Sequence, residues 1–127
     1  MLPPIDMFNN AALFIDIPER PQDITVVEIQ SRSLVLSWIK PHDNNAPILG
    51  YFIFYEQPSF AGGEMIIFPT ADEGASLTEL FPGVTYNFTV IAYNAIGNST
   101  ESDSIQLKTI DEGTYAYVLY HIVIIVM

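Results

Sequence analysis

With 127 residues, the chain has room for one domain and a short surplus. Half of its residues are hydrophobic and 13% are aromatic, so it can build a packed core and is not of a disordered composition. Only 4 basic residues stand against 15 acidic ones, and a net charge of −11 would repel a nucleic-acid backbone. The lack of cysteine excludes disulfides, cysteine-based zinc sites and a cysteine nucleophile, but it leaves secretion open.

The N-terminal stretch lacks the pattern of a secretory signal, which begins with positive charge and continues with an apolar run. The first basic residue is Arg20, and Asp6 and Asp16 interrupt the apolar stretch. We therefore expect no signal peptide at Met1, and we assign residues 1–17 to a linker or to the end of a preceding module.

Between residues 18 and 109, short runs of alternating apolar and polar residues are separated by Pro, Gly and Asn clusters. This pattern predicts strands, and no segment has the periodicity of an amphipathic helix. Loops or turns are expected at 41–47, 58–63, 71–74 and 82–83. In chain order, the expected strands lie around residues 24–26, 33–38, 51–55, 65–68 (ended by Pro69), 77–80, 86–92 and 105–107.

Several residue patterns recur in a defined order along this segment. They are Pro21-x-x-Ile24-x-Val26, Leu34-x-Leu36-x-Trp38-x-x-Pro41, Ile48-x-Gly50-Tyr51-x-Ile53-x-Tyr55, Leu77-x-x-Leu80-x-Pro82-Gly83-x-x-Tyr86-x-Phe88-x-Val90-x-Ala92-x-Asn94, then Gly97 and Thr109. Together they resemble the signature of fibronectin type III domains. The resemblance implies an all-β fold, a seven-stranded immunoglobulin-like β-sandwich of fibronectin type III topology, over residues 18–110.

Three residues are expected to hold this core rather than to form a site. Trp38, the only tryptophan, falls at an inward-facing position where a large ring fills the space between two sheets. The resemblance places Tyr86 at the tyrosine corner, with its hydroxyl directed to the backbone near Leu80.

Nothing in the sequence predicts catalysis, and no cofactor or metal is expected. His42 and His121 are the only candidates for a histidine base; His42 lies in a Pro/Asn loop typical of a solvated turn, and His121 lies in the apolar tail. The acidic pairs at 72–73 and 111–112 lack the alternating ligand spacing of a calcium loop and are better explained as turn residues.

The alternation predicts an apolar patch on one face of the sandwich. If Tyr51, Ile53 and Tyr55 face the core, their neighbours on the same strand face outward. The resemblance places this strand beside the 86–92 strand. The expected exposed patch, a candidate protein-binding surface, consists of Phe52, Phe54, Ile91 and Tyr93.

Two N-glycosylation sequons are present, Asn87-Phe88-Thr89 and Asn98-Ser99-Thr100. Roughly one such triplet is expected by chance in a chain of this composition. Both asparagines are expected to point outward, and a glycan on Asn87 would confine any contact to the far end of the patch.

Residues 111–127 are assigned to an apolar C-terminal tail, in which Tyr115 to Met127 carries no charge. Its tyrosines followed by aliphatic residues resemble the start of a transmembrane helix, although the run is too short to span a bilayer. A tail from a truncated or altered transcript is the alternative.

These features favour a non-catalytic interaction or spacer module of an extracellular adhesion or receptor protein, anchored at the cell surface, with neighbouring fibronectin type III or immunoglobulin modules. One alternative is an intracellular spacer of a muscle-type repeat protein, and another is an accessory domain of a secreted enzyme. The protein partner is not specified by the sequence, because there is no Arg-Gly-Asp in the 95–98 loop and no Trp-Ser-x-Trp-Ser motif.

Overall fold

The computed structural model describes residues 14–59 and 62–112, and its regular structure is a set of seven strands. Alternating apolar residues, rich in β-branched and aromatic types, form most of them. The strands are β1 (Gln22–Ile29), β2 (Leu34–Ile39), β3 (Gly50–Ser59), β4 (Gly62–Thr70), β5 (Gly74–Leu77), β6 (Thr85–Tyr93) and β7 (Ile105–Lys108).

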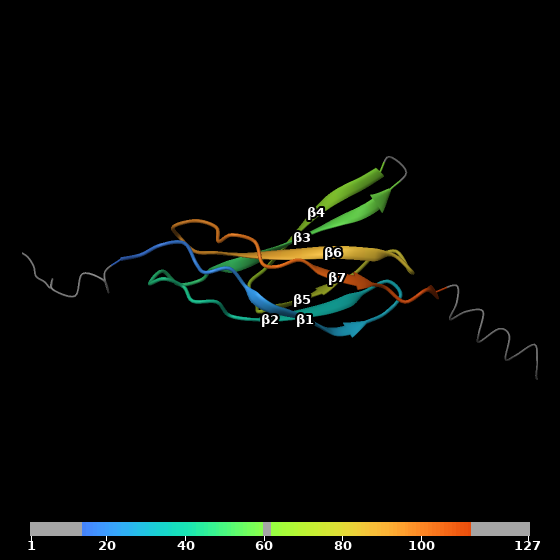
Figure 1. Cartoon of the computed structure of the whole chain (residues 1–127), viewed down its shortest axis with the longest axis horizontal. Coiled ribbons are helices and arrows are strands. Elements are labelled where there is room, and N and C mark those ends of the chain that lie inside the picture. Colours follow the sequence, from blue (N-terminus) through green and yellow to red (C-terminus); the bar gives the residue numbers. More distant parts are fainter. Residues whose placement is uncertain (1–13, 60–61, 113–127) are drawn as a thin grey trace, which may run out of the picture.

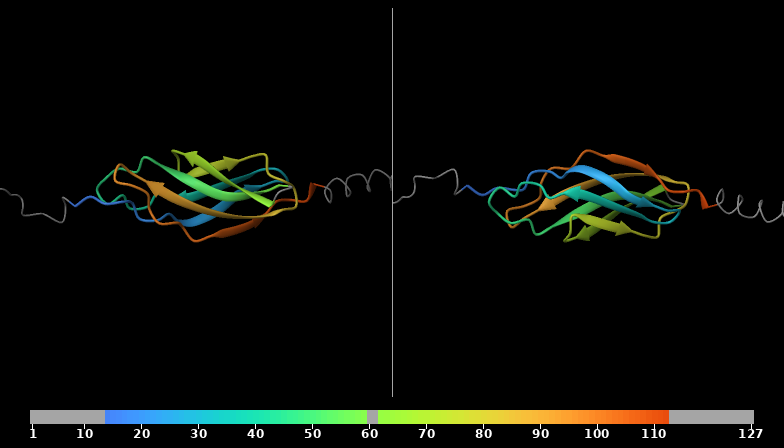
Figure 2. Two further views of the ribbon diagram at one scale, coloured as in Figure 1. Left: turned by 90° about the horizontal axis from the view of Figure 1, so that it is seen from above. Right: turned by 90° about the horizontal axis from the view of Figure 1, so that it is seen from below.

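The strands form two antiparallel sheets that pack face to face (Figure 1). One sheet has the order β1-β2-β5 and the other β4-β3-β6-β7. The described chain begins at one end of the sandwich and leaves at the opposite end (Figure 2). The predicted all-β, seven-stranded sandwich is therefore confirmed.

The core lies between the two sheets and is built from every second residue of the central strands. Trp38 is 4% exposed, and its ring meets the ring of Tyr51 edge-on at a centroid distance of 5.2 Å. The buried members are Leu34, Leu36, Trp38, Tyr51, Ile53, Tyr55, Ala75, Leu77, Leu80, Tyr86, Phe88, Val90 and Ala92.

The turn before β6 is fastened by two buried hydroxyl groups. The backbone N–H of Phe81 donates to the Tyr86 hydroxyl at 2.8 Å. On the other side of the same residue, the Thr109 hydroxyl donates to the Phe81 carbonyl at 2.6 Å and accepts from the Val84 N–H at 3.0 Å. Tyr86 and Thr109 thus satisfy backbone groups that would otherwise lack partners next to the core.

Strand β1 departs from the simple alternation expected for it. Its pairing with β2 contains register shifts between Gln22 and Thr25 and between Val26 and Glu28. An extra residue in one strand reverses the direction of the side chains that follow it. Val26 pairs with the buried Leu36 and so lies on the core side, but it is 36% exposed. Ile24 and Ile29 pack against the core.

The β3–β4 hairpin is longer than the sequence indicated. Residues 58–63 were expected to form a loop, but the strands pair as far as Ser59 and Gly62. Pairing of β3 with β6 stops at Tyr55, so the rest of the hairpin extends beyond the sandwich as a two-stranded arm (Figure 1). Pro69 lies within β4 rather than ending it, which is compatible with an edge strand that has one unpaired side.

Candidate functional site: the outer face of the four-stranded sheet

The face of the four-stranded sheet that points away from the core carries the candidate site, here called the outer face. Strand register brings its residues together, because directly paired residues share a face. Phe52 pairs with Ile91 on β6 and with Pro69 on β4, and Phe54 pairs with Thr89 and Ile67. The outer face comprises Phe52, Phe54, Glu56, Met65, Ile67, Pro69, Thr85, Asn87, Thr89, Ile91, Tyr93, Gln106 and Lys108.

The four residues of the predicted patch do lie on this one face, but they are less exposed than expected. Ile91 is only 6% exposed, and the prediction that it is an exposed patch residue was wrong. Strand β3 flanks it on one side. On the other side, the 99–102 segment hydrogen-bonds along β6, with the N–H groups of Ser99 and Ser102 donating to Ala92 and Val90. Period-2 alternation predicts which side of the sheet a side chain faces, but it does not show whether another segment covers that side chain.

Two rings form a fixed pair at one end of the face. Phe52 and Tyr93 are half-buried and stack with a centroid distance of 4.9 Å. The Tyr93 ring lies over Gly50, where an added Cβ would stand 2.9 Å from the Tyr93 hydroxyl and 3.0 Å from the Thr70 carbonyl oxygen. Glycine at position 50 therefore allows the ring to lie flat against the sheet.

The most exposed apolar side chains of this face are on β4, which sequence reasoning did not assign to the patch. Met65 is 61% exposed and Ile67 is 55% exposed. The signal was present in the sequence, since Ile66 and Phe68 are apolar at alternate positions and pack inward. Extending the alternation across the third strand would have found both residues.

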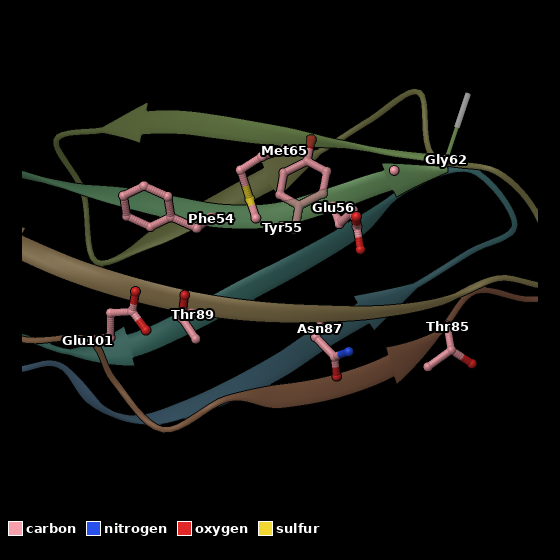
Figure 3. A pocket seen from close by; sticks show the side chains of 10 residues that line it. Phe54, Tyr55, Glu56, Gly62, Met65, Thr85, Asn87, Thr89 and Glu101 are labelled. Carbon is pink, nitrogen blue, oxygen red and sulfur yellow. The ribbon is translucent and has the colours of Figure 1, made fainter. Parts of the chain in front are cut away.

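Beside the rings, the outer face is hollowed (Figure 3). The hollow has a volume of about 520 Å³ and takes side chains from β3, β4 and β6. Glu101 lies at the end near Thr89, whereas Glu56 lies toward Gly62 and the hairpin (Figure 3). Apolar contacts from Phe54 and Met65 and two carboxylates thus line one depression.

Both sequon asparagines are exposed on the surface. Asn87 lines the hollow between Thr85 and Thr89, whereas Phe88 of the same sequon is buried in the core. Asn98 lies in the loop after β6, where its backbone bridges to Tyr93.

The structure gives the acidic pair at 72–73 a structural use. The Tyr51 hydroxyl donates to the Glu73 carboxylate at 2.7 Å. Burial raises the pKa of Tyr51 far above its ordinary value, and the hydrogen bond to Glu73 raises it further. Within the described residues, no group of three or more His, Asp or Glu side chains is placed to hold a metal ion.

The C-terminal tail lies almost wholly outside the described residues, as does His121. Among residues 14–59 and 62–112, no helix has the length and apolar character needed to cross a bilayer.

The two packed sheets define an immunoglobulin-like β-sandwich module with a partly apolar sheet face. The sequence model of the fibronectin type III domain matches residues 19–108. The chain belongs to the fibronectin type III family.

Comparison with known proteins gives the family context. The chain is 33% identical over 99 residues to the cell adhesion molecule Dscam1 of Drosophila melanogaster, covering 76% of this chain and 5% of Dscam1. It is 36% identical over 88 residues to neurofascin of Gallus gallus, covering 67% of this chain and 6% of neurofascin. The crystal structure of domains A168–A170 from titin superposes with a TM-score of 0.66 at 23% identity, covering 76% of this chain and 34% of that one. The chain thus spans a small fraction of the length of these relatives.

Proposed function

We propose that the chain is a non-catalytic module of an extracellular or cell-surface adhesion protein and that it binds a protein partner through the outer face. The single observation that carries the binding role is the apolar surface formed by Phe52, Ile67 and Tyr93 beside an acidic hollow. The relatives of adhesion type support the setting. The titin likeness supports the fold and keeps an intracellular spacer as the second candidate.

The charge of the face favours one kind of partner. Glu56 and Glu101 line the hollow, and Lys108, on β7 opposite Thr85, is the basic residue nearest to it along the sheet. A second copy of this acidic chain would bring like charges together, which weakens association. We therefore expect the partner to present arginine or lysine beside an apolar side chain.

A glycan on Asn87 and a basic partner that pairs with Glu56 and Glu101 would compete for the hollow, so an occupied Asn87 leaves the partner only the ring end of the face. Asn87 lies at the hollow, whereas the stacked rings of Phe52 and Tyr93 lie toward the start of β3. A sugar on Asn87 would cover the hollow and leave the ring end open.

Compartment is tested by glycosylation. The chain, secreted from cultured cells behind a generic signal peptide, is expected to carry glycans on Asn87 and Asn98, because both asparagines are exposed. Asn87→Gln and Asn98→Gln should each remove one glycosidase-sensitive mass increment. A folded, secreted and unglycosylated chain would favour the intracellular spacer.

The binding face is tested with a defined probe, a short peptide in which arginines flank a leucine and a tryptophan. Added to the unglycosylated chain, it should shift the backbone amide signals of residues 52–54 and 89–93. Ile67→Lys should weaken binding about tenfold, because it places a cation in the contact surface. The matched control is Val27→Lys, the same kind of change at a similarly exposed position on the other sheet, which should leave the affinity for the peptide unchanged. Equal losses in both variants, or shifts scattered over the whole domain, would contradict the proposal.

A further inference from the structure

The segment that precedes β1 does not hang free but runs along two loops at the same end of the sandwich (Figure 2). Its backbone donates twice to the loop between β2 and β3. The Asp16 N–H bonds to the Asn44 carbonyl at 3.1 Å, and the Glu19 N–H bonds to the His42 carbonyl at 2.9 Å. Residues 1–17 were assigned to a linker or to the end of a preceding module, and in the structure residues 14–17 are hydrogen-bonded to the domain.

Three asparagine side chains complete the attachment. Asn45 Nδ2 donates to the Phe14 carbonyl at 2.7 Å, and Asn44 Nδ2 donates to the Ile17 carbonyl at 2.7 Å. Asn94 Nδ2, from the loop after β6, donates to the Asp16 carbonyl at 2.8 Å. We call Asn44, Asn45 and Asn94, with the backbone that they bind, the N-terminal clamp.

The geometry of the clamp explains why asparagine occupies positions 44 and 45. Both residues have positive φ, 53° and 71°, a conformation that asparagine tolerates better than other residues with a side chain. Consecutive residues in this conformation turn the loop so that both side-chain amides reach the same segment. Glycine would keep the backbone but remove both amides.

Exposed apolar side chains occupy the surface at the start of the clamp. Phe14 is 72% exposed and Ile15 is 54% exposed, although their backbone is held in place. Ile96, in the loop after β6, is 46% exposed, and its neighbour Gly97 lies against the Ile17 side chain. An exposed apolar surface whose backbone is fixed, at the end where the chain enters the domain, fits contact with a globular module in the same polypeptide.

We propose that this end of the domain is a rigid junction, in which the N-terminal clamp fixes the path of residues 14–19 and so sets the orientation of a globular module preceding it in the same polypeptide. The small share of Dscam1 and neurofascin that the chain covers is consistent with such a neighbour. The junction is independent of the outer face, so either proposal can fail alone.

The test measures how sharply the segment is held in the full chain. Because the chain has no cysteine, nitroxide labels can be attached at Phe14→Cys and Lys108→Cys without background. Phe14 uses only its carbonyl in the clamp, and both positions are exposed. Pulsed electron–electron double resonance should give a distance distribution about as narrow as that of a strand-to-strand pair, Val27→Cys with Lys108→Cys.

The clamp itself is tested by removing two of its amides. Asn44→Gly with Asn45→Gly should broaden the distribution for the Phe14–Lys108 label pair at least about twofold. Glu79→Gly is the matched control, since Glu79 also has positive φ but lies outside the N-terminal clamp, and it should leave the width unchanged. A broad distribution in the unmodified background, or no broadening after loss of the amides, would overturn the proposal.

Discussion

Replacing Asn94 with aspartate is expected to lower the free energy of unfolding by about 3 kcal/mol. Asn94 is 5% exposed, and its Nδ2 donates to the carbonyl groups of Asp16, Asp43 and Ala46. Its Oδ1 accepts from the N–H groups of Ile96 and Gly97. A carboxylate keeps the accepting bonds but turns its second oxygen toward three carbonyl oxygens, which lose their donor and repel the new charge.

Urea denaturation of the two variants Asn94→Asp and Asn98→Asp measures this effect against a matched control. The chemical change is identical, but Asn98 is exposed, so its variant should remain within about 0.5 kcal/mol of the unmodified chain. Burial raises the pKa of the introduced carboxyl group, so the deficit of Asn94→Asp should shrink as the pH falls and the group protonates. Equal stabilities of the two variants at neutral pH would show that the Asn94 network contributes nothing.

The central strands were predictable because every second position in them carries an apolar residue that faces the core. Leu34, Leu36 and Trp38 alternate with half-buried residues, and β6 repeats the pattern from Tyr86. One buried face then specifies which side of each strand faces the core, and the family resemblance placed the 51–55 strand beside the 86–92 strand. Such local patterns are carried by the sequence itself.

The features that were missed depend on segments distant in the chain. The carbonyl partners of Asn94 lie 48 to 78 residues away in the chain. The sequence pattern around Asn94 therefore could not predict that its side chain hydrogen-bonds to three distant carbonyl groups. Ile91 lies between β3 and the 99–102 segment, which hydrogen-bonds along β6 from a different part of the chain. Alternation describes one strand, whereas a surface is made by several elements.

The outer face and the N-terminal clamp also differ in whether local sequence patterns bring their residues together. The rings of the outer face come from adjacent strands, so register placed them together once the pairing was known. The clamp joins residues 14–17 to two loops, and no periodic pattern predicts bonds between loops. A binding surface on strands is therefore easier to derive from sequence than a junction built from loops.

Loss of both hydroxyl groups at the turn before β6, through Tyr86→Phe and Thr109→Val, is expected to lower the free energy of unfolding by about 3 kcal/mol. Each change preserves side-chain shape but removes a partner of the Phe81 backbone, so each alone should cost about 2 kcal/mol. The two single-variant costs should add up to more than the cost of the double variant. Loss of one hydrogen bond to Phe81 lets the exposed turn relax, so that water can reach the backbone group of Phe81 that the second change leaves without a partner.

A double-mutant cycle by chemical denaturation measures this coupling. Thr85→Val is the matched control for the threonine change, since Thr85 is exposed on β6, and it should alter the free energy of unfolding by less than about 0.5 kcal/mol. Strict additivity of the two losses would mean that the hydroxyls act separately. A cost for Thr109→Val no larger than that for Thr85→Val would show that its buried bonds to Phe81 and Val84 do not stabilise the fold, and the turn would then be held by Tyr86 alone.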